Sequence, residues 1–178
     1  MVSLIVVFWM YVILFGIIGA MRGWAKELLV MFSVILALFF ITVLELFVPF
    51  IRDVLSFGNG APLFWIRVGI TAILVLFGYQ TPNIPKLAGN NRFVRERLQD
   101  VLLGIFIGMV NGYFVMGSIW SFLDDAKYPF PTIISAPTGD VLTLVNKYVA
   151  ILPPHILGSP AIYFAVAIAF AFVLMVFI

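Results

Sequence analysis

The chain has 178 residues, of which 64% are hydrophobic and only 10% are charged. An average soluble domain is about half apolar and about a quarter charged, so this composition excludes an ordinary soluble enzyme and indicates a membrane protein. The formal charge of +2 is too small to indicate a nucleic-acid partner. Cysteine is absent, which excludes disulfides, thiolate metal sites and iron–sulfur clusters. The single histidine, His155, falls in a predicted loop, so no cofactor is expected.

Five apolar stretches are long enough for membrane-spanning helices, which need roughly 20 mostly apolar residues. They are residues 2–21, 28–50, 61–79, 101–123 and 160–178. Helices are expected because unpaired backbone polar groups in lipid cost several kcal/mol each. The sequence therefore predicts an all-α, polytopic membrane helix bundle with about five transmembrane helices.

Basic residues are distributed unequally over the predicted connections between these spans. The connections 22–27 and 80–100 hold six of them, against three in 51–60 and 124–159, with Arg67 near that second face. The positive-inside rule therefore predicts that the N-terminus is outside and the C-terminus cytoplasmic. The predicted cytoplasmic-interface residues are Arg22, Lys26, Glu27, Arg92, Arg95, Arg97 and Asp100. The basic segment 91–99 predicts contact with anionic lipids, with a specific protein partner as the alternative.

The outer segment 124–159 contains one amphipathic pattern. Its apolar positions at helical spacing are Val141, Leu144, Val145, Tyr148 and Val149. A short helix is expected there, capped by Thr138 and ended by the pair Pro153 and Pro154. This helix would lie on the outer membrane interface or pack on the outer surface of the bundle.

Small residues recur every four positions in the first and fourth predicted spans. The predicted helix-packing residues are Gly16, Gly19, Gly23, Gly104, Gly108 and Gly112. Glycine on one helical face allows another backbone to approach closely. The pattern predicts that the first span packs against the fourth, or that each packs against a copy of itself.

Three polar side chains fall within the apolar stretches: Glu45, Arg67 and Asn111. Glu45 and Arg67 lie at similar depths, about 8–9 Å below the outer edge. An ion pair is expected, although each side chain could instead reach outward, or the pair could serve a proton or ion step. Asn111 lies about 15 Å deep and is expected to form a hydrogen bond between helices, with substrate contact as the alternative.

Two motifs together resemble the colicin V production protein (CvpA) family. The first is Arg22-Gly-x-x-Lys-Glu-Leu-Leu29, and the second is Asp100-x-Leu-Leu-Gly104-x-x-x-Gly108-x-x-x-Gly112. The family usually has arginine at the positions that Val101 and Asn111 occupy here. The resemblance implies a four-helix membrane core over residues 1–123. The outer loop 124–159 and an additional C-terminal transmembrane helix, 160–178, would follow it.

The resemblance also implies a function. Members are bacterial inner-membrane proteins linked to colicin V production or export and to envelope maintenance. The first hypothesis is therefore a non-enzymatic membrane protein that acts through helix–helix contacts, with other membrane subunits or its own copies as partners. An accessory subunit of a large respiratory or photosynthetic complex and an oligomeric channel or transporter are the alternatives. No serine–histidine, metal or phosphate-binding pattern indicates an enzyme.

Overall fold

The computed structural model describes residues 4–48, 50–51, 60–80 and 94–177. Its helices are α1 (Leu4–Arg22), α2 (Trp24–Phe47), α3 (Ala61–Tyr79), α4 (Val94–Asp125), α5 (Gly139–Val149), α6 (Pro153–Ile156) and α7 (Ala161–Phe177). The described residues contain no strand, which confirms the predicted all-α fold. Arg92 lies outside the described residues, and Arg95 is described only as part of the helical backbone of α4.

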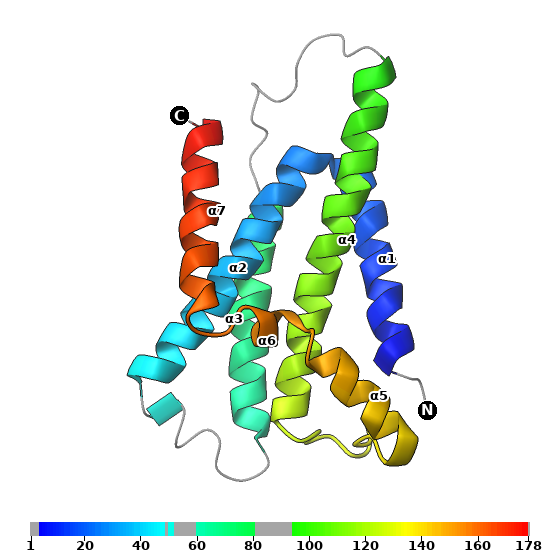
Figure 1. The fold of residues 1–178 in the computed structure, drawn as a ribbon, viewed down its shortest axis with the longest axis vertical. Coiled ribbons are helices and arrows are strands. Elements are labelled where there is room, and N and C mark those ends of the chain that lie inside the picture. Colours follow the sequence, from blue (N-terminus) through cyan, green and yellow to red (C-terminus); the bar gives the residue numbers. More distant parts are fainter. Residues whose placement is uncertain (1–3, 49, 52–59, 81–93, 178) are drawn as a thin grey trace.

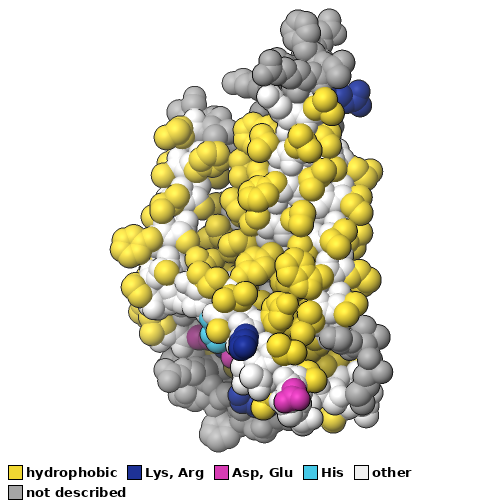
Figure 2. All heavy atoms as spheres, turned by 45° about the vertical axis from the view of Figure 1, so that its right-hand side comes forward, with side chains coloured by type: hydrophobic (Ala, Val, Ile, Leu, Met, Phe, Trp, Pro, Cys, Tyr) yellow, Lys and Arg dark blue, Asp and Glu magenta, His cyan; other side chains and the backbone are white. Residues whose placement is uncertain are grey.

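Four helices, α1 to α4, are long and apolar enough to cross a membrane. Hydrophobic side chains cover the middle of the molecule, and the coloured charged side chains gather toward its two ends (Figure 2). The chain is therefore a helical, multi-pass membrane protein. The fifth predicted span forms α7, an apolar helix of 17 residues, at the lower end of the range of about 17–25 residues that can cross a membrane.

The bundle has two ends, which differ in their connections (Figure 1). The hairpin end is where α1 turns into α2, α3 ends and α4 begins; the loop end carries α5 and α6. At the hairpin end, the predicted six-residue connection 22–27 is wrong, because Gly23 alone separates α1 from α2. Gly23 has φ 84°, which glycine adopts without the strain that a Cβ would cause. Lys26 and Glu27 therefore belong to the first turn of α2.

Helix α4 is also longer than the apolar stretch 101–123 that predicted it. It begins at Val94 and ends at Asp125. Arg and Glu are good helix formers, so the charged residues before the apolar stretch continue the helix beyond it. Arg97 and Asp100 therefore lie on α4 and not in a connecting loop.

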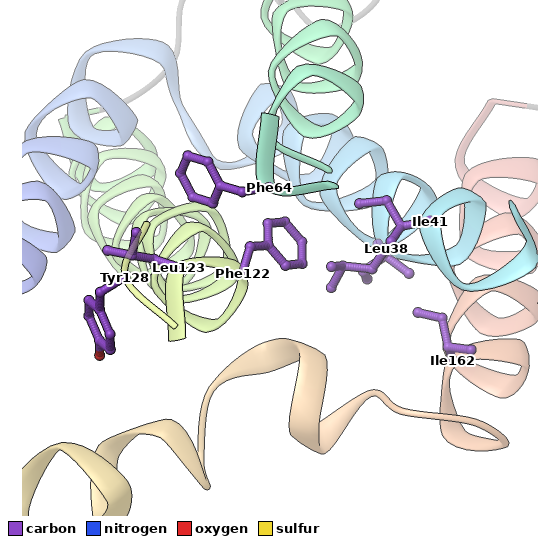
Figure 3. Packing of buried hydrophobic residues seen from close by; sticks show 8 residues of the cluster. Leu38, Ile41, Phe64, Phe122, Leu123, Tyr128 and Ile162 are labelled. Carbon is purple, nitrogen blue, oxygen red and sulfur yellow. The ribbon is translucent and has the colours of Figure 1, made fainter. Parts of the chain in front are cut away.

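Apolar packing at the loop end ties together α2, α3, α4 and α7 (Figure 3). The labelled residues of this core are Leu38, Ile41, Phe64, Phe122, Leu123, Tyr128 and Ile162. Ile162, in the first turn of α7, is fully buried, whereas Phe164, Ile168 and Met175 further along are mostly exposed. Helix α7 is therefore fixed to the bundle at its start and presents most of its remaining surface outward.

The predicted amphipathic helix is α5, which follows Thr138 and ends at Val149. Val145 and Val149 are buried in a cluster with Trp120, and Tyr148 stacks on the Trp120 ring at a centroid distance of 5.9 Å. One edge of α5 thus packs on the bundle, while its other apolar residues remain exposed: Val141, Leu142 and Leu144. Thr138 takes the N-cap position, but its side chain makes no capping hydrogen bond.

The sequence analysis missed α6. Pro153 and Pro154 do not only end α5; they begin this short helix, in the first-turn positions where proline needs no backbone N–H. Pro153 and Leu152 are buried against α4, where a Cβ on Gly117 would lie 2.7 Å from the Pro153 ring. This glycine therefore lets α6 approach α4 closely.

Candidate functional site

Helices α1 and α4 approach each other backbone to backbone along the glycine seam (Gly16, Gly19, Gly104, Gly108 and Gly112). A Cβ added to Gly19 would overlap the carbonyl oxygen of Gly104, and one added to Gly104 would overlap that of Gly19. A Cβ on Gly108 would likewise overlap the Phe15 carbonyl oxygen. The predicted packing of the first span against the fourth is therefore confirmed, and it depends on the missing side chains.

At the hairpin end, Asp100 of α4 meets the junction of α1 and α2. The Trp24 N–H donates to its Oδ1 at 3.4 Å, and a Cβ on Gly23 would lie 2.9 Å from the same oxygen. The first backbone N–H groups of a helix lack partners within it and carry partial positive charge. The Asp100 carboxylate therefore stabilises the start of α2 from another helix.

A buried polar cluster lies below this junction. We call it the hairpin-end cluster; it comprises Arg22 on α1, Glu27 on α2, Tyr79 on α3 and Asn111 on α4. Glu27 and Asn111 are both 0% exposed. The Asn111 Nδ2 donates to Glu27 Oε2 at 2.8 Å and to the Glu27 backbone oxygen at 2.9 Å. The interhelical hydrogen bond predicted for Asn111 is thus confirmed, and its partner is Glu27.

Arg22 supplies the positive charge of the hairpin-end cluster. Its Nε lies 3.0 Å from Glu27 Oε1 in an ion pair, although the two atoms are not aligned as a hydrogen bond. A terminal guanidinium nitrogen donates to the Tyr79 backbone oxygen at 3.1 Å, and the guanidinium carbon lies 4.4 Å from the centre of the Tyr79 ring. Arg22 therefore connects α1 to both α2 and α3.

Two of the predicted interface positions are corrected by these contacts. The Glu27 side chain is fully buried among the helices, and the Arg22 side chain is only 21% exposed and points to protein partners. The reason is the short turn at Gly23, which brings the first turn of α2 inside the bundle. A carboxylate buried there requires a cation or hydrogen-bond donors.

Lys26 and Arg97, which were also predicted to lie at the cytoplasmic interface, are accessible at the surface of the protein. Lys26 is partly exposed on α2, and Arg97 is exposed near the start of α4. Both belong to the first turns of their helices, and Arg22 and Asp100 belong to the end of α1 and the beginning of α4; these helix ends form the hairpin end in Figure 1. The described residues of the predicted interface therefore share one end of the molecule.

A second polar cluster lies at the loop end. We call it the loop-end cluster; it comprises Glu45 on α2, Arg67 on α3 and Asp125 on α4. The Arg67 Nε donates to Glu45 Oε1 at 2.6 Å, and a terminal nitrogen donates to Oε2 at 3.1 Å. Such two-point contact of guanidinium and carboxylate is strong and geometrically specific. The ion pair predicted between Glu45 and Arg67 is thus present in the structure.

Asp125 is a member that the sequence analysis missed. Its Oδ2 accepts a hydrogen bond from the other terminal nitrogen of Arg67 at 2.8 Å. The available signal was its place directly after the fourth apolar stretch, at the same end of the bundle as Glu45. Because α4 continues through this residue, its carboxylate is held on a helix within reach of α3.

Two cavities border the loop-end cluster, and both are lined by Arg67, Phe122 and Asp125. The larger, of about 600 Å³, extends to Tyr128, and the smaller, of about 210 Å³, extends to Ser121. Burial raises the pKa of the Tyr128 hydroxyl to about 12, so this group adds no charge at neutral pH. No group of three or more His, Cys, Asp or Glu side chains in the described part of the chain is arranged to hold a metal ion.

No protein-family model, curated protein or solved structure matches the chain. The candidate sites are therefore assigned from the contacts within the structure alone. Glu27 and Asn111 of the hairpin-end cluster are fully buried among the helices, whereas the loop-end cluster borders two open cavities. The first can stabilise a particular helix arrangement, and the second can meet a ligand.

Proposed function

We propose that the chain is a CvpA-like integral membrane protein of the bacterial inner membrane. It acts without enzymatic chemistry, through helix–helix contacts, in envelope maintenance or in colicin V-type production and export. In this proposal the hairpin end is cytoplasmic and faces anionic lipids, so the N-terminus is outside and the C-terminus inside. The observation that carries the proposal is the meeting in space of the two motifs on which the resemblance rests.

The contacts between the two motifs involve residues of each. Asp100 of the second motif accepts the Trp24 N–H directly after Gly23 of the first. Asn111, which falls within the second motif, donates to Glu27 of the first, 84 residues away. The two segments therefore form one structural unit in this chain, and this supports treating the two motifs together. With a neutral side chain at position 111, Arg22 is the cation that balances Glu27.

The outer surface of the bundle supports a function through association. Large apolar side chains on α1, α3 and α7 are more than half exposed, among them Met21, Phe77 and Phe164. Lipid covers such residues in a bilayer, and so can the helices of other membrane subunits or further copies of this chain. The proposed partners are accordingly membrane helices.

Complementation in a bacterium that lacks its own CvpA protein tests this proposal. We expect the chain to restore release of colicin V or resistance to envelope stress. Asn111→Leu should weaken the rescue, because it removes the donor to the buried Glu27 carboxylate. Asn146→Leu is the matched control, since it makes the same change at an exposed asparagine of α5, and it should rescue fully. No rescue by the unaltered chain, at normal levels in the membrane, would refute the proposal.

The mass of the intact assembly, purified in mild detergent, separates the remaining hypotheses. Stoichiometric co-purification with the subunits of a large respiratory or photosynthetic complex would favour the accessory-subunit hypothesis. Ion flux into liposomes that disappears with Glu45→Gln would favour a channel or transporter. The proposed function predicts neither result.

A further inference from the structure

The smaller cavity at the loop end has the features of a ligand site. It is an open cavity of about 210 Å³ where α2, α3, α4 and α6 converge. Its polar lining consists of Thr42, Glu45, Arg67, Ser121, Asp125 and His155. Figure 2 shows the histidine and acidic side chains together toward the lower end of the molecule, below the apolar surface.

The lining of this cavity has an excess of negative charge and of hydrogen-bond acceptors. Glu45 and Asp125 contribute two carboxylates against the single guanidinium of Arg67, so the formal charge is −1 with His155 neutral. Arg67 takes up one lone pair on each Glu45 oxygen and one on Asp125 Oδ2. Since a carboxylate offers about four acceptor positions, several remain for a donor in the cavity.

Ser121 is the independent sign that something occupies this space. Ser121 lines the cavity and is 0% exposed, and its Oγ is buried and has no hydrogen-bond partner among the residues that the structure describes. The large majority of buried polar side-chain atoms in folded proteins have a hydrogen-bond partner, either in the protein or in an ordered water. One turn earlier on α4, Ser118 shows the ordinary arrangement, in which Oγ donates to the Phe114 carbonyl oxygen at 2.6 Å.

The volume and the lining of the cavity limit the kinds of molecule that can bind in it. One water takes up about 30 Å³ of liquid, so the cavity has room for a small organic ion. The described residues offer no cluster of three or more metal-ligating side chains, which disfavours a bare metal ion. We propose that the cavity binds a protonated primary amine, with the ammonium hydrogens on Asp125, Glu45 and Ser121 and the carbon chain against Leu38 and Ile41. The amine is either a free small molecule or the headgroup of an aminophospholipid.

Titration of the purified, detergent-solubilised full chain with ethanolamine tests the site at constant ionic strength. Heat release and the thermal unfolding midpoint report binding. We expect saturable binding that Ser121→Ala weakens about tenfold, the effect of losing one hydrogen bond to a charged group. The unliganded variant should unfold at the same or a higher temperature, because an unsatisfied hydroxyl is removed. Ser118→Ala is the matched control and should bind as the unaltered chain does.

Two further arms distinguish the sources of the amine. In nanodiscs, phosphatidylethanolamine should raise the unfolding midpoint more than phosphatidylcholine, which lacks N–H donors, if a headgroup is the ligand. If the ligand is a free amine, added ethanolamine should raise the unfolding midpoint, and the choice between the two lipids should not change it. Asp125→Asn should weaken either form of binding while Glu45 still holds Arg67. Absence of saturable binding in both arms, or equal binding by the Ser121→Ala variant, would overturn the assignment.

Discussion

The glycine seam makes a quantitative prediction for Gly19→Ala. The new methyl group would lie 2.9 Å from the Gly104 carbonyl carbon and 3.0 Å from the Gly108 Cα. Normal carbon–carbon contact is about 3.5–4.0 Å, so α1 and α4 must separate by about 0.5–1 Å. The obstacles are backbone atoms of a neighbouring helix, which cannot rotate away as a side chain can.

The expected loss of stability follows from this separation. A gap of about 0.5–1 Å forfeits a quarter to a half of each dispersion contact across the interface, and overpacking typically costs about 1–3 kcal/mol. Alanine regains about 1 kcal/mol of helix propensity over glycine. Because backbone is displaced, we take the upper part of the range and expect a net loss of about 1–2 kcal/mol.

Gly69→Ala is the control that isolates the steric effect. Gly69 lies on α3 with no atom within 4 Å of its potential Cβ, so this variant gains helix propensity without a clash. Unfolding in mixed detergent and SDS micelles, followed by tryptophan fluorescence, should place the two variants about 2–3 kcal/mol apart. Equal stabilities within about 0.5 kcal/mol would refute the argument that the missing side chains hold α1 on α4.

Three further predictions concern the polar clusters and the orientation. Asn111→Leu should destabilise the chain by about 1.5–3 kcal/mol, since the Glu27 carboxylate loses its buried donor. When this change is combined with Glu27→Gln, the two losses of stability should be far from additive. Additivity within about 0.5 kcal/mol would contradict the contact. Glu45→Gln and Arg67→Met, made singly and together, should also show coupled losses of stability, and purely additive ones would remove the ion pair. Because the chain has no cysteine, Arg97→Cys gives a single thiol, which a membrane-impermeant maleimide should modify only after permeabilisation; a cysteine at an exposed position of α5 should react in intact cells, and the reverse pattern would invert the proposed orientation.

Several features were predictable because they depend on residues close together in the chain. The apolar stretches set the approximate positions of the spans, since each must be about as long as the hydrocarbon layer is thick. The glycine spacing identified the packing faces of α1 and α4, because residues four positions apart lie on the same face of a helix. The pair of Glu45 and Arg67 was predictable because the two residues lie at the same depth on consecutive helices.

The tertiary structure decided which distant groups meet. Asn111 and Glu27 are 84 residues apart, and no local pattern relates them; their contact requires both the one-residue turn at Gly23 and the close approach of α4. The same turn places the Glu27 side chain among the packed helices, where the sequence alone did not indicate burial. Asp125 joined the loop-end cluster because α4 extends beyond its apolar stretch. Hydrophobicity along a chain determines which segments enter a membrane, whereas the rotation and register of packed helices determine the partners of the few polar groups inside.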